Sequence, residues 1–185
     1  MSDSRLGRAS VNILIMALAA IAIFMQSGCQ TVDDSRIPAM PVYIDLSDPG
    51  RWNTYGVSGY GSFNYFVFQP GSAREPSGFP YLDTSATGYG GVLLIEGMDP
   101  FMLETLTPLA YDLACPVEKS PTVRVRIDAA TYEAVCPVCD SHYDVTMGGG
   151  APLSGPALGG EHKYGLKRYY CHKTIYNTYT ITSTP

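Results

Sequence analysis

Four cysteines in the second half of the chain are the residues best suited to chemistry. Cys115 begins the run Cys115-Pro116-Val117, Cys136 begins Cys136-Pro137-Val138-Cys139, and Cys171 follows alone. Thiols can join as disulfides, bind zinc as thiolates or act as a redox pair. A redox Cys-x-x-Cys pair is expected to open a helix after a strand, whereas this motif lies between two strand-like segments. That arrangement argues against a thioredoxin-like activity.

Disulfides and zinc both remain open on these residues alone. An oxidising compartment favours disulfides, which stabilise by about 2–4 kcal/mol each. Four cysteines allow three pairings. Zinc could take Cys115, Cys136 and Cys139 with a fourth ligand, but structural zinc sites usually combine two complete knuckles and this chain has one.

The residues that follow the cysteines resemble the Rieske iron–sulfur superfamily. In that family a Cys-x-His loop and a Cys-Pro-x-His loop hold a [2Fe–2S] cluster, and a third loop, Ser-Gly-Pro-Ala, covers it. Ser141, Tyr143 and Asp144 continue the second loop as in the family, and the run Ser154-Gly155-Pro156-Ala157 matches the covering loop. The resemblance implies an all-β fold, a Rieske-like antiparallel sandwich or barrel with a small cluster-binding-type subdomain, whose loops lie within residues 113–158.

The resemblance also implies that the cluster site is degenerate. Cys115 and Cys136 match the cysteines that bind one iron, but Val117 and Cys139 stand where the two histidines should bind the other. A Rieske centre needs both imidazoles, and valine cannot bind a metal. His142 is expected on the outgoing strand, half exposed, and not as a substitute ligand.

We therefore expect no cofactor, with an atypically ligated [2Fe–2S] cluster or a zinc ion on Cys115, Cys136 and Cys139 as the alternatives. If the loop tips converge as in the Rieske fold, Cys115 lies close to Cys136 or Cys139, which favours a disulfide between them. We expect Cys171 to be a packed or free thiol on a strand. His162 is expected in an exposed, glycine-rich loop.

Short strands must position these loops. Tyr, Phe, Gly and Pro are abundant, and charged residues make up only 16% of the chain, which favours strands and turns over helices. Alternating or fully apolar runs bounded by turn residues predict the strands. We find no convincing amphipathic helix, although Met98 to Leu106 could hold one or two turns. The predicted strands are Pro41–Leu46, Phe63–Phe68, Gly91–Ile95, Leu109–Leu113, Val123–Ile127, Tyr132–Val135, Tyr143–Val145, Leu166–Cys171 and Thr174–Thr182.

The N-terminus has the layout of an export signal. Arg5 and Arg8 precede an apolar run from Val11 to Met25, which ends at Gln26-Ser27-Gly28-Cys29. The run is short for a membrane span. Its end resembles the lipobox of bacterial lipoproteins, which implies a signal peptide over residues 1–28 and a lipidated Cys29. A plain secretory signal or an uncleaved anchor helix are the alternatives.

The lipoprotein resemblance divides the chain into the signal peptide, a polar tether over residues 29–40 and one Rieske-like domain over residues 41–185. Asp33 and Asp34 resemble the acidic surface-export tag of Bacteroidetes lipoproteins, although a soluble tether explains them equally well. Acyl chains on Cys29 would hold the protein at the cell envelope, on the periplasmic or the surface side.

The charge pattern and the side chains narrow the function. The net charge is −5 and the basic residues are scattered, which excludes a nucleic-acid binder. No base, nucleophile or paired carboxylates stand out, so we do not expect an enzyme. Two functions remain: a binding or structural module at the envelope with a protein partner still to be identified, or an electron-transfer protein with an atypical cluster. The missing histidines favour the first.

Overall fold

The computed structural model describes residues 31–68, 78–98, 106–160 and 162–185. The predicted signal peptide, Cys29 and most of the possible helical turns between Met98 and Leu106 lie outside the described residues. Compact packing begins at Val32 and continues to Pro185. Within the described residues, no helix is both long enough and apolar enough to pass through a bilayer.

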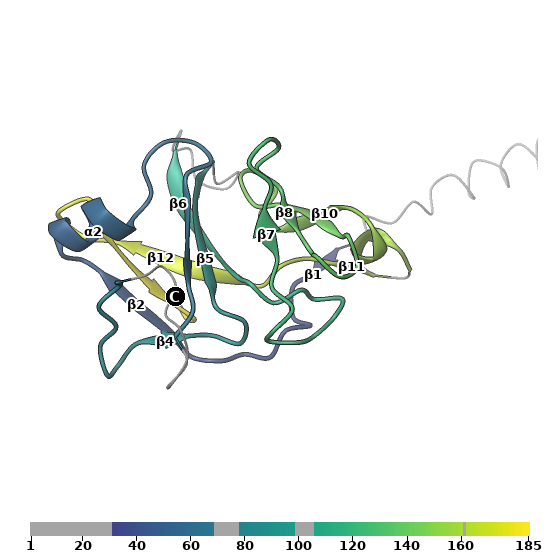
Figure 1. The fold of residues 1–185 in the computed structure, drawn as a ribbon, viewed down its shortest axis with the longest axis horizontal. Coiled ribbons are helices and arrows are strands. Elements are labelled where there is room, and N and C mark those ends of the chain that lie inside the picture. The colour runs from purple at the N-terminus through teal and green to yellow at the C-terminus, as the bar shows by residue number, and fades with distance from the viewer. Residues whose placement is uncertain (1–30, 69–77, 99–105, 161) are drawn as a thin grey trace, which may run out of the picture. The chain divides into compact units, whose positions relative to one another are not determined.

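A seven-stranded antiparallel sheet that nearly closes into a barrel is the main element of the domain (Figure 1). Its strand order is β3-β5-β6-β12-β13-β2-β4. Phe68 follows the edge strand β3, and Thr87 belongs to the other edge strand, β4. The backbone N–H of Phe68 donates to Thr87 Oγ1 at 3.1 Å, which brings the two edges together. The strands are β2 (Val42–Leu46), β3 (Phe63–Phe66), β4 (Ala86–Thr87), β5 (Val92–Gly97), β6 (Thr107–Asp112), β12 (Arg168–Lys173) and β13 (Tyr179–Thr182).

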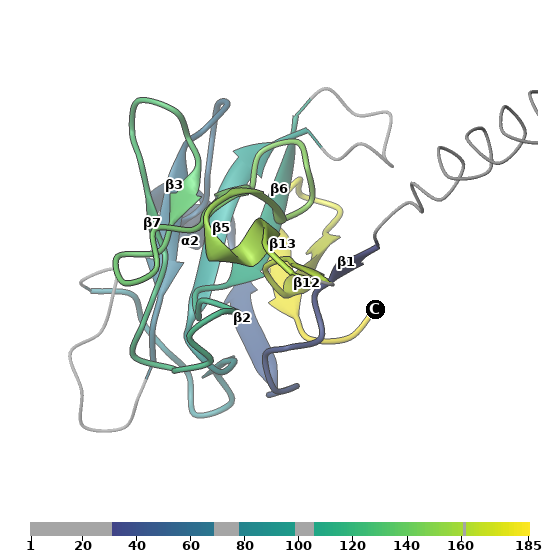
Figure 2. The ribbon, with the colours of Figure 1, turned by 90° about the vertical axis from the view of Figure 1, so that its right-hand side faces the viewer.

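A smaller antiparallel sheet, of strand order β10-β9-β8-β7, carries the loop with Cys136 and Cys139 between β8 and β9 (Figures 1 and 2). Its strands are β7 (Arg126–Ile127), β8 (Ala134–Val135), β9 (His142–Asp144) and β10 (Ala151–Ser154), and a 3-10 helix η1 (Pro156–Leu158) follows. The predicted all-β fold is confirmed.

Strand β5 shows why the two sheets pack together. All six of its residues are buried. Val92 and Leu94 face a core inside the larger sheet, while Leu93 and Ile95 face a second core that also contains Tyr143 of the smaller sheet. A strand with apolar contacts on both faces loses the usual alternation with polar residues, which explains the continuous apolar run in the sequence.

The segment expected as a tether differs from the prediction from residue 32 onward. Val32–Asp33 forms strand β1, which pairs in parallel with β11 (Lys163–Tyr164). Ile37 is only 1% exposed, and the Arg36 guanidinium stacks over the Tyr164 ring at 3.7 Å. The domain therefore starts near residue 32 and not at residue 41.

One short helix, α2 (Pro49–Tyr55), was not predicted. None of its residues is fully buried, and only Trp52 and Tyr55 pack partly against the core, which is too few apolar positions for hydrophobic periodicity to reveal the helix. Its signals are local. Asp48 accepts a hydrogen bond from the backbone N–H of Arg51 at 2.9 Å as the N-cap, and proline stands at the first helical position.

Candidate functional site

The first cysteine loop leaves the end of β6 and returns as the strand-like segment before β7. The backbone N–H of Cys115 donates to the carbonyl of Val123 at 3.1 Å, and the N–H of Lys119 donates back to the carbonyl of Cys115 at 2.9 Å. Lys119 has φ 52°, which closes the turn. Backbone hydrogen bonds thus fix where the Cys115 side chain starts.

A buried carboxylate anchors the same loop. Asp112, at the end of β6, accepts hydrogen bonds from the backbone N–H groups of Tyr89, Gly90 and Ala114 and from the Tyr169 hydroxyl. Burial raises the pKa of Asp112, although these donors pull it down. An acidic residue at the end of an apolar strand is a local sign of this role, but Asp112 was not singled out from the sequence.

The second cysteine loop is a tight turn between β8 and β9. The backbone N–H of Cys136 donates to the carbonyl of Ser141 at 2.9 Å, and the N–H of Asp140 donates to the carbonyl of Cys136 at 3.1 Å. Asp140 adopts φ 55°, a left-handed conformation that Asp tolerates better than most residues. The turn directs Cys136 and Cys139 toward the first loop.

The third loop covers this turn. Ser141 is fully buried, and its Oγ accepts a hydrogen bond from the backbone N–H of Ala157 at 3.0 Å. Gly155 has φ 79° and ψ −170°, and a Cβ there would lie 2.6 Å from the carbonyl oxygen of Asp140. The Ser154-Gly155-Pro156-Ala157 run therefore packs directly on the Cys-x-x-Cys turn.

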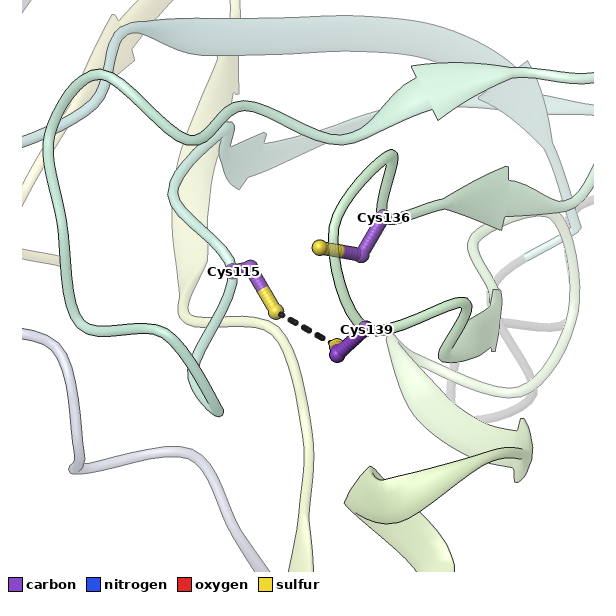
Figure 3. A group of neighbouring side chains, drawn as sticks. All are labelled: Cys115, Cys136 and Cys139. Carbon is purple, nitrogen blue, oxygen red and sulfur yellow. Dashed lines mark hydrogen bonds between the residues drawn. The ribbon is translucent and has the colours of Figure 1, made fainter.

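Three sulfur atoms converge where the loops meet (Figure 3). The Sγ atoms of Cys115, Cys136 and Cys139 all lie within 4.8 Å of one another. The Sγ atoms of Cys115 and Cys139 are 3.6 Å apart. Cys115 Sγ also lies 3.5 Å from the Tyr143 hydroxyl, and the Cys139 thiol donates to Ser141 Oγ at 3.2 Å.

The first cysteine of this cluster is held as a neutral thiol. Burial raises the pKa of Cys115 from the ordinary value of 9.0 to about 12, although a hydrogen bond from Tyr143 lowers it. Burial also raises the pKa of the Tyr143 hydroxyl. Both groups are therefore uncharged at neutral pH. Cys115 is a thiol there and not a nucleophilic thiolate.

Other residues singled out from the sequence lie outside the sulfur cluster. Val117 is half-buried and packs against the core shared by the two sheets. His142 Nδ1 lies 2.7 Å from Glu133 Oε2, at the start of β9. Asp144 Oδ1 accepts hydrogen bonds from the backbone of the turn that follows β9. Cys171 lies on β12 against the core inside the larger sheet, and His162 is exposed.

The donor set does not fit a [2Fe–2S] cluster. Such a cluster takes four protein ligands. Among the His, Cys, Asp and Glu residues that the structure describes, the group that converges here has three members. The nearest further polar groups are the hydroxyls of Ser141 and Tyr143, each already hydrogen-bonded to a cysteine sulfur.

The same donor set fits three corners of a tetrahedral zinc site better. Zn–S bonds of about 2.3 Å place the sulfurs of such a site about 3.8 Å apart. The 3.6 Å separation of the Cys115 and Cys139 sulfurs is close to that spacing. The same distance also makes Cys115 and Cys139 candidates for a disulfide, although both are free thiols in this structure.

Comparison with known proteins adds no family to this picture. No protein-family model matches the chain, and no curated protein matches its sequence.

Proposed function

We propose that this protein is a non-enzymatic, lipid-anchored envelope module with a Rieske-like fold, in which Cys115 and Cys139 form a disulfide in place of a metal cluster. The observation that supports it is the 3.6 Å approach of two sulfurs from separate loops. The module serves as a binding or structural unit for an envelope partner.

The chemistry of the proposed bond is a two-electron oxidation. The Cys115 and Cys139 thiols lose two protons and two electrons and gain one S–S bond, and a protein disulfide of the export compartment is reduced to its dithiol in exchange. Cys139 is half-buried while Cys115 is fully buried. The exchange is therefore expected to begin at Cys139, with Cys115 completing it.

Peptide mapping of the purified full-length protein tests this proposal. Under non-reducing conditions we expect one linked peptide pair that contains Cys115 and Cys139, and alkylatable Cys136 and Cys171 after denaturation. A Cys171→Ser variant is the matched control, because it removes a thiol elsewhere in the fold and should leave the linked pair unchanged. Four alkylatable thiols in protein taken from the envelope would contradict the disulfide.

The second candidate is a single zinc ion on the three thiolates, supported by the sulfur spacing. An electron-transfer role with an atypical cluster has less support, because the fourth ligand is missing from the described group. Metal analysis and the visible spectrum of protein purified without oxygen, after growth with iron and zinc, distinguish the two. One equivalent of zinc in colourless protein favours the first, and stoichiometric iron with sulfide favours the second.

The membrane anchor is tested separately. The proposed lipid attachment at Cys29 predicts that labelled fatty acid is incorporated into the wild-type chain and into Cys171→Ser, but not into Cys29→Ala. Loss of the acyl chains should also release the processed protein from the membrane fraction. Equal labelling of the Cys29→Ala variant would contradict the lipoprotein assignment.

A further inference from the structure

A groove with a volume of about 470 Å³ lies between the larger sheet and the segment that leads into β7. Phe63 and Tyr65 of β3 line it together with Thr122, residues 124–127 and Pro137 of the second cysteine loop. Figure 2 shows β3 and β7 next to each other. The volume is in the range of small-ligand sites.

Two arginines give the groove its charge. Arg124 and Arg126 both line it, and none of its described lining residues is acidic. Within the described part of the chain, neither guanidinium lies within ion-pair distance of a carboxylate. Two guanidinium groups at positions 124 and 126, with no acidic residue beside them in the described lining, create a local positive field that attracts anions.

The walls of the groove are held in place by specific contacts. Arg124 Nε donates to the carbonyl of Gly90 at 2.5 Å, which fixes that guanidinium and leaves its terminal nitrogens as donors. The Tyr65 hydroxyl accepts the backbone N–H of Ile127 at 2.9 Å and so ties β3 to β7. A site with fixed walls and fixed donors loses little entropy when it binds a ligand.

The chemistry of the lining selects the ligand class. Guanidinium groups bind planar carboxylates through paired hydrogen bonds. The rings of Phe63 and Tyr65, with centroids 5.2 Å apart, offer an apolar surface beside them, and Phe63 is 36% exposed. We propose that this groove binds a small organic carboxylate, with its carboxylate at Arg124 and Arg126 and its apolar body along the Phe63 and Tyr65 rings.

This proposal does not rest on the oxidation state or metal content of the cysteines, because none of the three cluster cysteines lines the groove. Its test uses the full-length protein in a non-ionic detergent and three probes: benzoate, its neutral analogue benzamide, and inorganic phosphate. Ligand-observed NMR or calorimetry measures the dissociation constants at low ionic strength. The variants are Arg126→Gln and Arg124→Gln, and Arg51→Gln serves as a matched control, since Arg51 pairs with Asp45 outside the groove.

We expect saturable binding of benzoate, with benzamide and phosphate at least tenfold weaker. Loss of one charge-assisted contact in Arg126→Gln should weaken benzoate about tenfold, added salt should weaken it further, and Arg51→Gln should leave it unchanged. Arg126 is exposed, so this variant is expected to fold. Equal affinity for benzoate and benzamide, phosphate binding tighter than benzoate, no saturable benzoate binding, or unchanged binding in Arg126→Gln would each overturn the proposal.

Discussion

Replacing Cys139 by serine removes the proposed covalent link between the two cysteine loops. Cys115 and Cys139 are 24 positions apart in the chain. Closing a ring of about 25 residues in the unfolded state corresponds to about 3.5 kcal/mol of stabilisation in the chain-entropy model. We therefore expect the free energy of unfolding to fall by about that amount, for the Cys139→Ser variant and for the reduced wild-type protein alike.

Urea unfolding of the full-length protein in detergent, followed by tyrosine fluorescence, measures this difference. With an m-value of about 2 kcal/mol/M, the midpoint should shift down by about 1.8 M urea on reduction. The Cys139→Ser variant should begin at the lower midpoint and show no further change with reductant. Cys171→Ser can lower the midpoint itself, since Cys171 packs against the core, but its downward shift on reduction should equal that of the wild type.

Cys136 requires its own control, because its sulfur lies within 4.8 Å of the other two. In Cys139→Ser it could take over the link to Cys115. The double variant Cys136→Ser, Cys139→Ser removes that possibility. The unfolding free energy that the single variant retains and the double variant loses therefore measures a Cys115–Cys136 disulfide in the single variant. If the oxidised wild type and the double variant unfold at the same urea concentration, no disulfide links the two cysteine loops and the chain-entropy argument is refuted.

Three further predictions concern the loops. The Gly155→Ala variant should lose about 3 kcal/mol of unfolding free energy, because its backbone conformation is nearly restricted to glycine and a Cβ would collide with Asp140. The control variant Gly160→Ala has open space around it and should lose less in the same urea titration. Ser141→Ala should lose about 1–3 kcal/mol, because the buried N–H that it caps is left without an acceptor; a loss below 0.5 kcal/mol would contradict that role. Burial raises the pKa of Cys115 from 9.0 to about 12. The difference in unfolding free energy between the reduced wild type and Cys115→Ser should therefore stay constant below pH 9 and shrink between pH 9 and 12. Parallel pH profiles of the two proteins would contradict this burial effect.

Strands β2 and β5 were predictable because a strand that is buried on one face alternates apolar and polar residues, and a strand that is buried on both faces is apolar throughout. Val42, Ile44 and Leu46 are buried at every second position of β2, as period-two alternation requires. The apolar run at β5 predicts a strand with both faces covered. The alternation of apolar and polar residues, or an unbroken apolar run, results from burial alone. No turn or cap signal within these segments competes with the strand prediction.

The elements that escaped prediction owe their structure to partners far away in sequence. Strand β1 forms because Val32–Asp33 meets Lys163–Tyr164, about 130 residues later. Its two residues carry no periodic signal, so the segment resembles a polar linker. Strand β4 is equally short, since Ala86–Thr87 pairs only with the start of β2.

The cysteine site shows the same division between local pattern and tertiary contact. The order of Cys115, Cys136 and Cys139 indicated that they belong together. The 3.6 Å approach of Cys139 to Cys115 depends on side-chain directions at the end of two turns, which the sequence does not encode locally. Arg124 and Arg126 alternate with apolar residues in the strand expected at Val123–Ile127, and nothing local marks them as a binding site, because the aromatic residues opposite them come from β3, about 60 positions earlier.

The three loops are held together by hydrogen bonds that need no metal ion. In many small metal domains the ion itself organises the ligands, and its removal unfolds the site. Here the turn at Cys136 is closed by backbone hydrogen bonds to Ser141 and Asp140, and Ser141 in turn holds the third loop through Ala157. None of these bonds uses a sulfur atom. The scaffold therefore positions the thiols of Cys115, Cys136 and Cys139 independently of what they bind, and under the proposed Rieske-like fold Val117 and Cys139 would change the chemistry of the site while leaving its supports in place.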